Sequence, residues 1–175
     1  VQRLVLVASG GLGKEVSPLL KAVTLPGAEY VLPLLLHPRI REAGEWPASL
    51  ARRLGWRPTV TLAEVWRSYT TLTDRHSQQA FIHTVRSVID VAGQRVSAHD
   101  RLYLAEALPT LIVWGDQDRI IPVAHAYQAA EAMGRARLEI LEGAGHFLPW
   151  RNADWFLPIL EDFLKAIRTT GTPVC

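Results

Sequence analysis

Residues 109–118 of this chain read PTLIVWGDQD, and a proline follows at position 122. The apolar run from Leu111 to Trp114 is followed by a glycine and then by two acidic residues, Asp116 and Asp118. A short continuous run of this kind predicts a strand that is buried on both faces, as in a parallel sheet. Because open α/β sheets place their sites in the loops at the carboxyl ends of parallel strands, we expect chemistry in the loop that follows Trp114.

Two other segments repeat this pattern of an apolar strand and a glycine-containing loop. Leu4 to Val7 is apolar and leaves into the loop Ala8-Ser9-Gly10-Gly11. Leu138 to Leu141 is a shorter apolar run, and residues 143–146 after it read GAGH. The sequence therefore predicts an α/β fold in which three parallel strands carry polar loops at one edge of the sheet.

Helices are expected after the second and third strands. Pro122 can begin a helix that Gly134 ends, because proline suits the first helical turn and glycine suits the end. Asn152 or Asp154 can cap the last helix. The apolar residues of that helix recur at helical spacing and predict a face that packs on the sheet; they are Trp155, Phe156, Ile159, Leu160, Phe163, Leu164 and Ile167.

The segment between the first two strands is rich in proline, tryptophan and leucine and shows no clear strand pattern. We expect a helix over 61–72 that begins with a Thr61/Glu64 capping box, and another over 75–89 with Phe81, Val85 and Val88 along one side. A helical insertion between parallel strands is expected to lie over the sheet edge as a cap. The predicted division is therefore a core of residues 1–11 and 91–169, a cap of 12–90 and a tail of 170–175.

The composition excludes several classes of function. Of the 175 residues, 49% are hydrophobic and 21% charged, and the formal net charge of +2 is spread over well-mixed acids and bases. We expect no nucleic-acid partner, because there is no basic stripe. No span of a membrane is expected either, because the longest apolar stretch is short and contains Pro33. The single cysteine, Cys175, allows no internal disulfide. We expect no metal ion, because the sequence has no CxxC motif and no clustered histidines at the spacing of metal ligands. The expected location is cytoplasmic.

Asp118 and His146 are the candidate catalytic residues. A neutral imidazole is a useful base near pH 7, and it needs a carboxylate on its second nitrogen to orient it. The loops at the ends of neighbouring parallel strands are adjacent in space, so the two side chains can meet. We prefer Asp118 to Asp116, because the position directly after the glycine usually faces the turn. The competing interpretation is an ordinary turn aspartate and an unrelated surface histidine.

The other polar candidates carry weaker signals. Ser9 follows a strand but lacks the glycine two positions before it that a nucleophile turn requires, so we expect a loop hydroxyl. The glycines after Ser9 lack the lysine spacing of a phosphate-binding loop. Surface or partly buried structural roles are expected for the remaining histidines, which are His37, His76, His83, His99 and His125.

Taken together, residues 109–118, Ile121-Pro122, Gly145-His146 and the final amphipathic helix resemble the end of an α/β-hydrolase of the lipase/esterase, epoxide hydrolase and haloperoxidase-like group. Residues 3–11 resemble the strand that follows the helix of the nucleophile in that family, and the insertion resembles the family's helical cap. The resemblance covers nearly the whole chain, from Val1 to about Thr169.

This resemblance implies a hydrolase with a triad of nucleophile, acid and histidine in that order. The family's nucleophile turn and its oxyanion-hole donors have no counterpart here, so we expect them upstream of Val1, in a missing half that packs on the first strand. A serine nucleophile would make an esterase of small or medium apolar carboxylic esters, and an aspartate would make an epoxide hydrolase or dehalogenase. A non-catalytic truncated hydrolase is the third alternative.

No metal or organic cofactor is implied. The substrate-binding candidates are Leu35, Trp66 and Phe147, because apolar side chains under the cap and beside His146 would suit a small apolar substrate.

Overall fold

The computed structural model describes residues 2–35, 74–105 and 108–166, together with positions 37, 39, 43, 49–50, 53–55 and 72. Most of the expected helix over 61–72 and the whole tail of 170–175 lie outside the described residues. The expected division into core, cap and tail stays a prediction for that reason.

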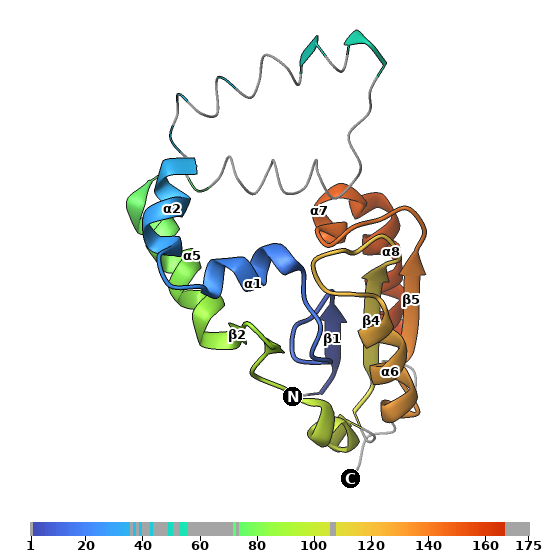
Figure 1. Cartoon of the computed structure of the whole chain (residues 1–175). Coiled ribbons are helices and arrows are strands. Elements are labelled where there is room, and N and C mark those ends of the chain that lie inside the picture. Colours follow the sequence, from blue (N-terminus) through green and yellow to red (C-terminus); the bar gives the residue numbers. More distant parts are fainter. Residues whose placement is uncertain are drawn as a thin grey trace.

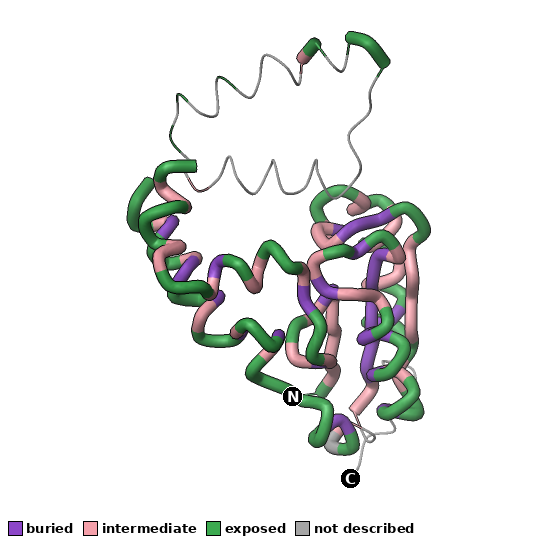
Figure 2. Tube along the Cα trace, viewed as in Figure 1, coloured by how far each residue is buried: buried purple, intermediate pink, exposed green. Residues whose placement is uncertain are grey.

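A parallel sheet of three strands forms the centre of the described chain. Strands β1 (Leu4–Val7), β4 (Thr110–Gly115) and β5 (Arg137–Leu141) are arranged in the order β1-β4-β5. The register pairs Leu4 with Thr110 on one side of β4 and Leu111 with Arg137 on the other. Every residue of β4 is buried, and Figure 2 shows this strand as a continuous buried segment in the middle of the sheet. The three predicted parallel strands are confirmed.

The burial of β1 differs from the expectation of a strand buried on both faces. All four residues of β1 are only partly buried, and within the described residues β1 pairs with β4 alone, at the edge of the sheet. Its apolar side chains still contact the core through Leu6 on one face and through Val5 and Val7 on the other. The apolar sequence predicts a strand, but its burial depends on how many neighbours that strand has.

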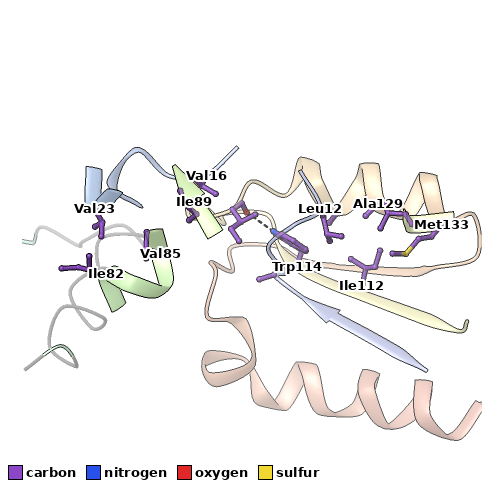
Figure 3. Close-up of a cluster of buried hydrophobic side chains, with 14 residues drawn as sticks. Leu12, Val16, Val23, Ile82, Val85, Ile89, Ile112, Trp114, Ala129 and Met133 are labelled. Carbon is purple, nitrogen blue, oxygen red and sulfur yellow. Dashed lines mark hydrogen bonds between the residues drawn. The ribbon is translucent and has the colours of Figure 1, made fainter. Parts of the chain in front are cut away.

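Helices pack on both faces of the sheet because side chains of β4 alternate in direction. Ile112 and Trp114 belong to one cluster with Met133 of helix α6 (Ala124–Met133). Leu111 and Val113 belong to a second cluster with Phe163 of helix α8 (Ala153–Ala166). Figure 3 shows Ile112 and Trp114 beside Ala129 and Met133, with the buried indole Nε1 of Trp114 donating to the carbonyl oxygen of Ile121 at 3.1 Å.

Helix α6 begins at Ala124 rather than at Pro122, although it ends as expected before Gly134. The first amides of this segment form short-range bonds instead of helical ones, from His125 N to Pro122 O and from Ala126 N to Val123 O. A tight turn therefore precedes the helix. Gly134 ends it with φ of +64°, a conformation that favours glycine.

Among the described residues, three α-helices come between β1 and β2 in the sequence. They are α1 (Pro18–Thr24), α2 (Ala28–Leu35) and α5 (Arg75–Val88), which contact one another and form a group away from α6 and α8 in Figure 1. The expected helix over 75–89 is confirmed, and the Asp74 side chain caps it by accepting from Ser77 N at 2.9 Å. Its buried face is rotated from the expected one, because Val85 is buried but Val88 is 40% exposed.

Several short elements were not expected from the sequence. They are β2 (Ile89–Asp90), β3 (Gly93–Gln94), the 3₁₀ helix η1 (His99–Ala105) and α7 (Leu148–Arg151). The β2–β3 hairpin holds the loop after β1, since Gln94 N donates to Lys14 O at 2.9 Å and Gly11 N donates to Gln94 Oε1 at 2.5 Å. Elements of two residues are too short to leave a periodic signal in the sequence.

Candidate active site

The acid loop, residues 116–123, follows β4 and holds Asp118 in one orientation. Its side chain is buried, and Asp118 Oδ1 accepts from the backbone amides of Ile120 and Ile121, each at 2.9 Å. An aspartate that binds amides two and three residues later closes a local turn through its own side chain. One carboxylate oxygen is thus occupied by the loop, and the other, Oδ2, is directed at a different partner.

That partner is His146, in the histidine loop (residues 142–147) that follows β5. His146 Nδ1 lies 2.9 Å from Asp118 Oδ2, and the imidazole side chain is 20% exposed. Because the carboxylate accepts, Nδ1 carries the proton in this hydrogen bond, and the basic lone pair of the neutral ring lies on Nε2. The two residues that the sequence singled out are therefore brought together, with the carboxylate buried and the imidazole partly exposed.

Phe147 is the substrate-binding candidate that the structure places beside this pair. The rings of His146 and Phe147 stack edge to face, with centroids 5.3 Å apart. Leu35 is the last residue of α2 and is 50% exposed. Trp66 lies outside the described residues. The substrate-binding role of all three stays a prediction.

The acid loop and the histidine loop are interlocked through their backbones. Asp116 N donates to Leu141 O at 3.2 Å, and Gln117 N donates to Ala144 O at 2.9 Å. A Cβ on Gly115 would overlap Ala144 O and would lie 2.8 Å from Gly145 O. Glycine at position 115 is therefore required for the two loops to approach this closely.

We expect Gly115→Ala to destabilise the protein by about 3 kcal/mol, because the added methyl meets backbone atoms that move only with the whole histidine loop. Gly134→Ala is the matched control. A Cβ there has open space and meets only the left-handed backbone strain, at a cost of about 1 kcal/mol. Urea unfolding of both variants measures the difference, and equal losses would contradict the close approach of the loops.

Asp116 is expected from the sequence to face the turn, and the structure gives its side chain a partner across the two loops. Asp116 Oδ1 accepts from Gly143 N at 2.7 Å. Gly143 has φ of +70°, in the left-handed region. Two glycine-containing turns after adjacent parallel strands were the available sequence signal, but they do not specify which acidic side chain crosses between the loops.

His125 is more deeply buried than expected. Its side chain has no exposed surface, and its Nε2 lies 2.8 Å from Glu15 Oε2 in the loop after β1. The hydrogen bond with the His125 ring holds the pKa of the Glu15 carboxyl below its ordinary value. The Glu15 side chain is 73% exposed, so this contact ties the start of α6 to the loop after β1 at the surface.

An open pocket of about 390 Å³ lies elsewhere, between the loop after β1 and the 3₁₀ helix η1. Its lining includes Lys14, Glu15, His99 and Asp100 but neither member of the Asp118–His146 pair. We place the candidate active site at the pair, because its hydrogen-bonded geometry is chemically specific and the pocket mixes charges of both signs. Within the described part of the chain, no cluster of three histidine, cysteine or acidic side chains is arranged to bind a metal ion. Among the same residues, no helix has the length and hydrophobicity required to cross a bilayer.

Comparison with known sequences places this chain in a family. The profile of the alpha/beta hydrolase fold family matches residues 34–153. An uncharacterised protein from Mycobacterium tuberculosis is 36% identical over 170 residues, which are 94% of this chain and 49% of that protein. A 2-hydroxy-6-oxo-6-phenylhexa-2,4-dienoate hydrolase from Comamonas testosteroni is 38% identical over 56 residues, which are 32% of this chain and 20% of the enzyme. The chain thus spans about half the length of the mycobacterial relative.

Solved structures share the fold over nearly the whole chain. A meta-cleavage product hydrolase from Pseudomonas fluorescens IP01 superposes with a TM-score of 0.57 at 22% identity, covering 95% of this chain and 57% of that one. A thermophilic esterase gives a TM-score of 0.57 at 21% identity, with 95% and 57% covered. At these identities the likeness is one of fold alone. The family profile, however, matches more than half of the chain, so the chain belongs to the α/β-hydrolase fold family.

Proposed function

We propose that this chain is part of a hydrolase that cleaves small or medium apolar carboxylic esters, and that Asp118 and His146 are the acid and the base of its triad. The observation that carries the proposal is the 2.9 Å contact between Asp118 Oδ2 and His146 Nδ1. A buried carboxylate that orients a partly exposed imidazole is the arrangement that general-base catalysis requires.

In the proposed reaction, His146 Nε2 takes the proton of a serine hydroxyl as its oxygen attacks the ester carbonyl. Asp118 keeps the ring in the required tautomer and stabilises the imidazolium that forms. The imidazolium then gives the proton to the departing alcohol and leaves an acyl-enzyme, which water hydrolyses with His146 again as the base. No metal or organic cofactor takes part in this sequence of steps.

We propose that the serine and the oxyanion-hole donors lie in sequence upstream of Val1. Two observations support this. The chain covers 49% of the mycobacterial relative, and β1 pairs on one side only within the described residues, leaving an apolar strand edge that a further strand can cover. We call this chain together with that upstream segment the full-length protein.

The helices between β1 and β2 are proposed to belong to a substrate-binding cap of residues 12–90. Residues 1–11 and 91–169 are proposed to form the core on which this cap lies. Leu35 and Trp66 would contribute apolar surface from the cap, and Phe147 would line the site beside His146. Support for an apolar substrate comes from the edge-to-face stacking of Phe147 on the catalytic ring.

Three alternatives differ in measurable ways. An aspartate nucleophile would make the protein an epoxide hydrolase or dehalogenase, in which His146 would activate water. The local match to a dienoate hydrolase makes a 2-hydroxy-6-oxo-6-phenylhexa-2,4-dienoate the second candidate substrate. A non-catalytic truncated hydrolase would keep the Asp118–His146 pair as a relic.

The test is turnover of a substrate panel by the full-length protein and by the 175-residue chain alone. We expect the full-length protein to hydrolyse a chromogenic short-chain ester and to react with a fluorophosphonate probe, which labels an activated serine but not an aspartate. The chain alone is expected to show no turnover, because two members of a triad cannot form the covalent intermediate. Turnover by the chain alone that disappears in His146→Ala would place the nucleophile within these residues. Turnover of the dienoate, an epoxide or a haloalkane in place of the ester would replace the ester proposal.

A further inference from the structure

We infer that Asp116 is a positioning residue of the active site, whose carboxylate joins the acid loop to the histidine loop and thereby sets the distance between Asp118 and His146. This inference rests on the proposed function, because it concerns how the proposed catalytic pair is held. Asp116 itself is not assigned any contact with substrate.

The contact is placed where it can control the pair. Asp116 stands two residues before Asp118, and its Oδ1 accepts from Gly143 N, three residues before His146, at 2.7 Å. The side chain is only partly buried, so this bond competes with water and the loops can separate when it is lost.

Backbone contacts in the same region would limit the separation without fixing the histidine. Asp116 N and Gln117 N bond to Leu141 O and Ala144 O, and these two bonds do not depend on the side chain at position 116. Besides the Asp118–His146 contact itself, the Asp116–Gly143 bond links the two loops through a side chain, and it acts on a residue with left-handed φ of +70°. We expect its removal to loosen the Gly143 turn, and His146 stands three residues after Gly143.

The accepting oxygen of the Asp116 side chain, rather than its negative charge, is inferred to hold the histidine loop in place. Replacement of Asp116 with asparagine tests this distinction. Asp116→Asn keeps an oxygen that accepts from Gly143 N but removes the negative charge, whereas Asp116→Ala removes both. Gln117→Ala is the matched control, because its backbone bond to Ala144 O remains and only a weak 3.4 Å contact to Asp116 Oδ2 is lost.

In the full-length protein we expect Asp116→Ala to lower kcat for the ester by roughly 10- to 100-fold with KM within about twofold, since displacing a catalytic group by about 1 Å has effects of this size. Asp116→Asn is expected to restore kcat to within about threefold of the wild type, and Gln117→Ala to leave it unchanged. If Asp116→Asn falls as far as Asp116→Ala, the charge acts and the positioning role is wrong.

A second measurement separates this inference from the proposed function. The downfield NMR resonance of the proton on His146 Nδ1 reports its hydrogen bond to Asp118 whether or not the enzyme turns over the ester. We expect Asp116→Ala to broaden this resonance by faster exchange with water and Asp116→Asn to preserve it. An unchanged resonance in Asp116→Ala would overturn the inference even if the wild type hydrolyses the ester. A broadened one would support it even if no ester in the panel is cleaved.

Discussion

Replacing His146 with alanine in the full-length protein is expected to lower kcat for ester hydrolysis on the order of 10⁵- to 10⁶-fold, because the loss of a triad histidine removes the base for both half-reactions. The remaining rate would come from the oxyanion hole and from substrate binding. KM is expected to change little, since the ring acts on the reacting proton and not on the bound ester. Steady-state kinetics with the chromogenic ester measures both constants.

The variant must remain folded for this result to count. Removing the ring leaves Asp118 Oδ2 buried without its partner, which costs about 1–3 kcal/mol. His146→Gln is the second variant, because its amide can donate a hydrogen bond to Asp118 but has no titratable nitrogen. Both variants are expected to lose activity alike while His146→Gln unfolds closer to the wild-type temperature.

His83→Ala is the matched control for His146→Ala. His83 is exposed on α5, in a helix interior where alanine is favourable, so its loss is expected to leave kcat and stability unchanged. A folded His146→Gln protein that keeps its hydrolytic rate would show that another group is the base. The proposed triad would then be wrong.

The sequence predicted the strands because a short continuous apolar run, in a chain of this composition, indicates a buried strand. β4 is wholly buried, as its run of Leu111 to Trp114 indicates. β1 has an equally apolar sequence but, within the described part of the chain, lies at an edge of the sheet and is only partly buried. The difference lies in the number of neighbouring strands, which a local pattern does not encode.

The candidate site was predictable to the extent that it depends on position along the strands. Asp118 and His146 each follow a strand, and parallel strands bring such loops to one edge. The contact of Asp116 with Gly143 was not predictable, because it depends on how closely two turns stack. The burial of His125 had a usable signal in the sequence, because a spacing of four residues puts His125 on the same face of the expected helix as Ala129. In the structure neither residue has any exposed surface.

Asp118→Asn in the full-length protein is expected to lower kcat by about 10⁴-fold while the fold is retained. Asparagine keeps the Oδ1 atom that accepts from Ile120 N and Ile121 N, so the acid loop loses no hydrogen bond of its own. Its amide nitrogen, however, replaces Oδ2 and presents a donor to His146 Nδ1. Nδ1 must then accept, and the proton of the neutral ring moves to Nε2.

That tautomer blocks catalysis without displacing any atom, because an Nε2 that already carries a proton cannot take another from the nucleophile. The unfolding temperature is therefore expected to fall by only a few degrees, a shift that corresponds to about 1 kcal/mol. Asp154→Asn, at an exposed position in the first turn of α8, is the matched control and is expected to keep the wild-type rate. If folded Asp118→Asn turned over the ester within about tenfold of the wild type, the orientation of His146 would depend on some other acid. The buried carboxylate would then serve only the turn that it closes with Ile120 and Ile121.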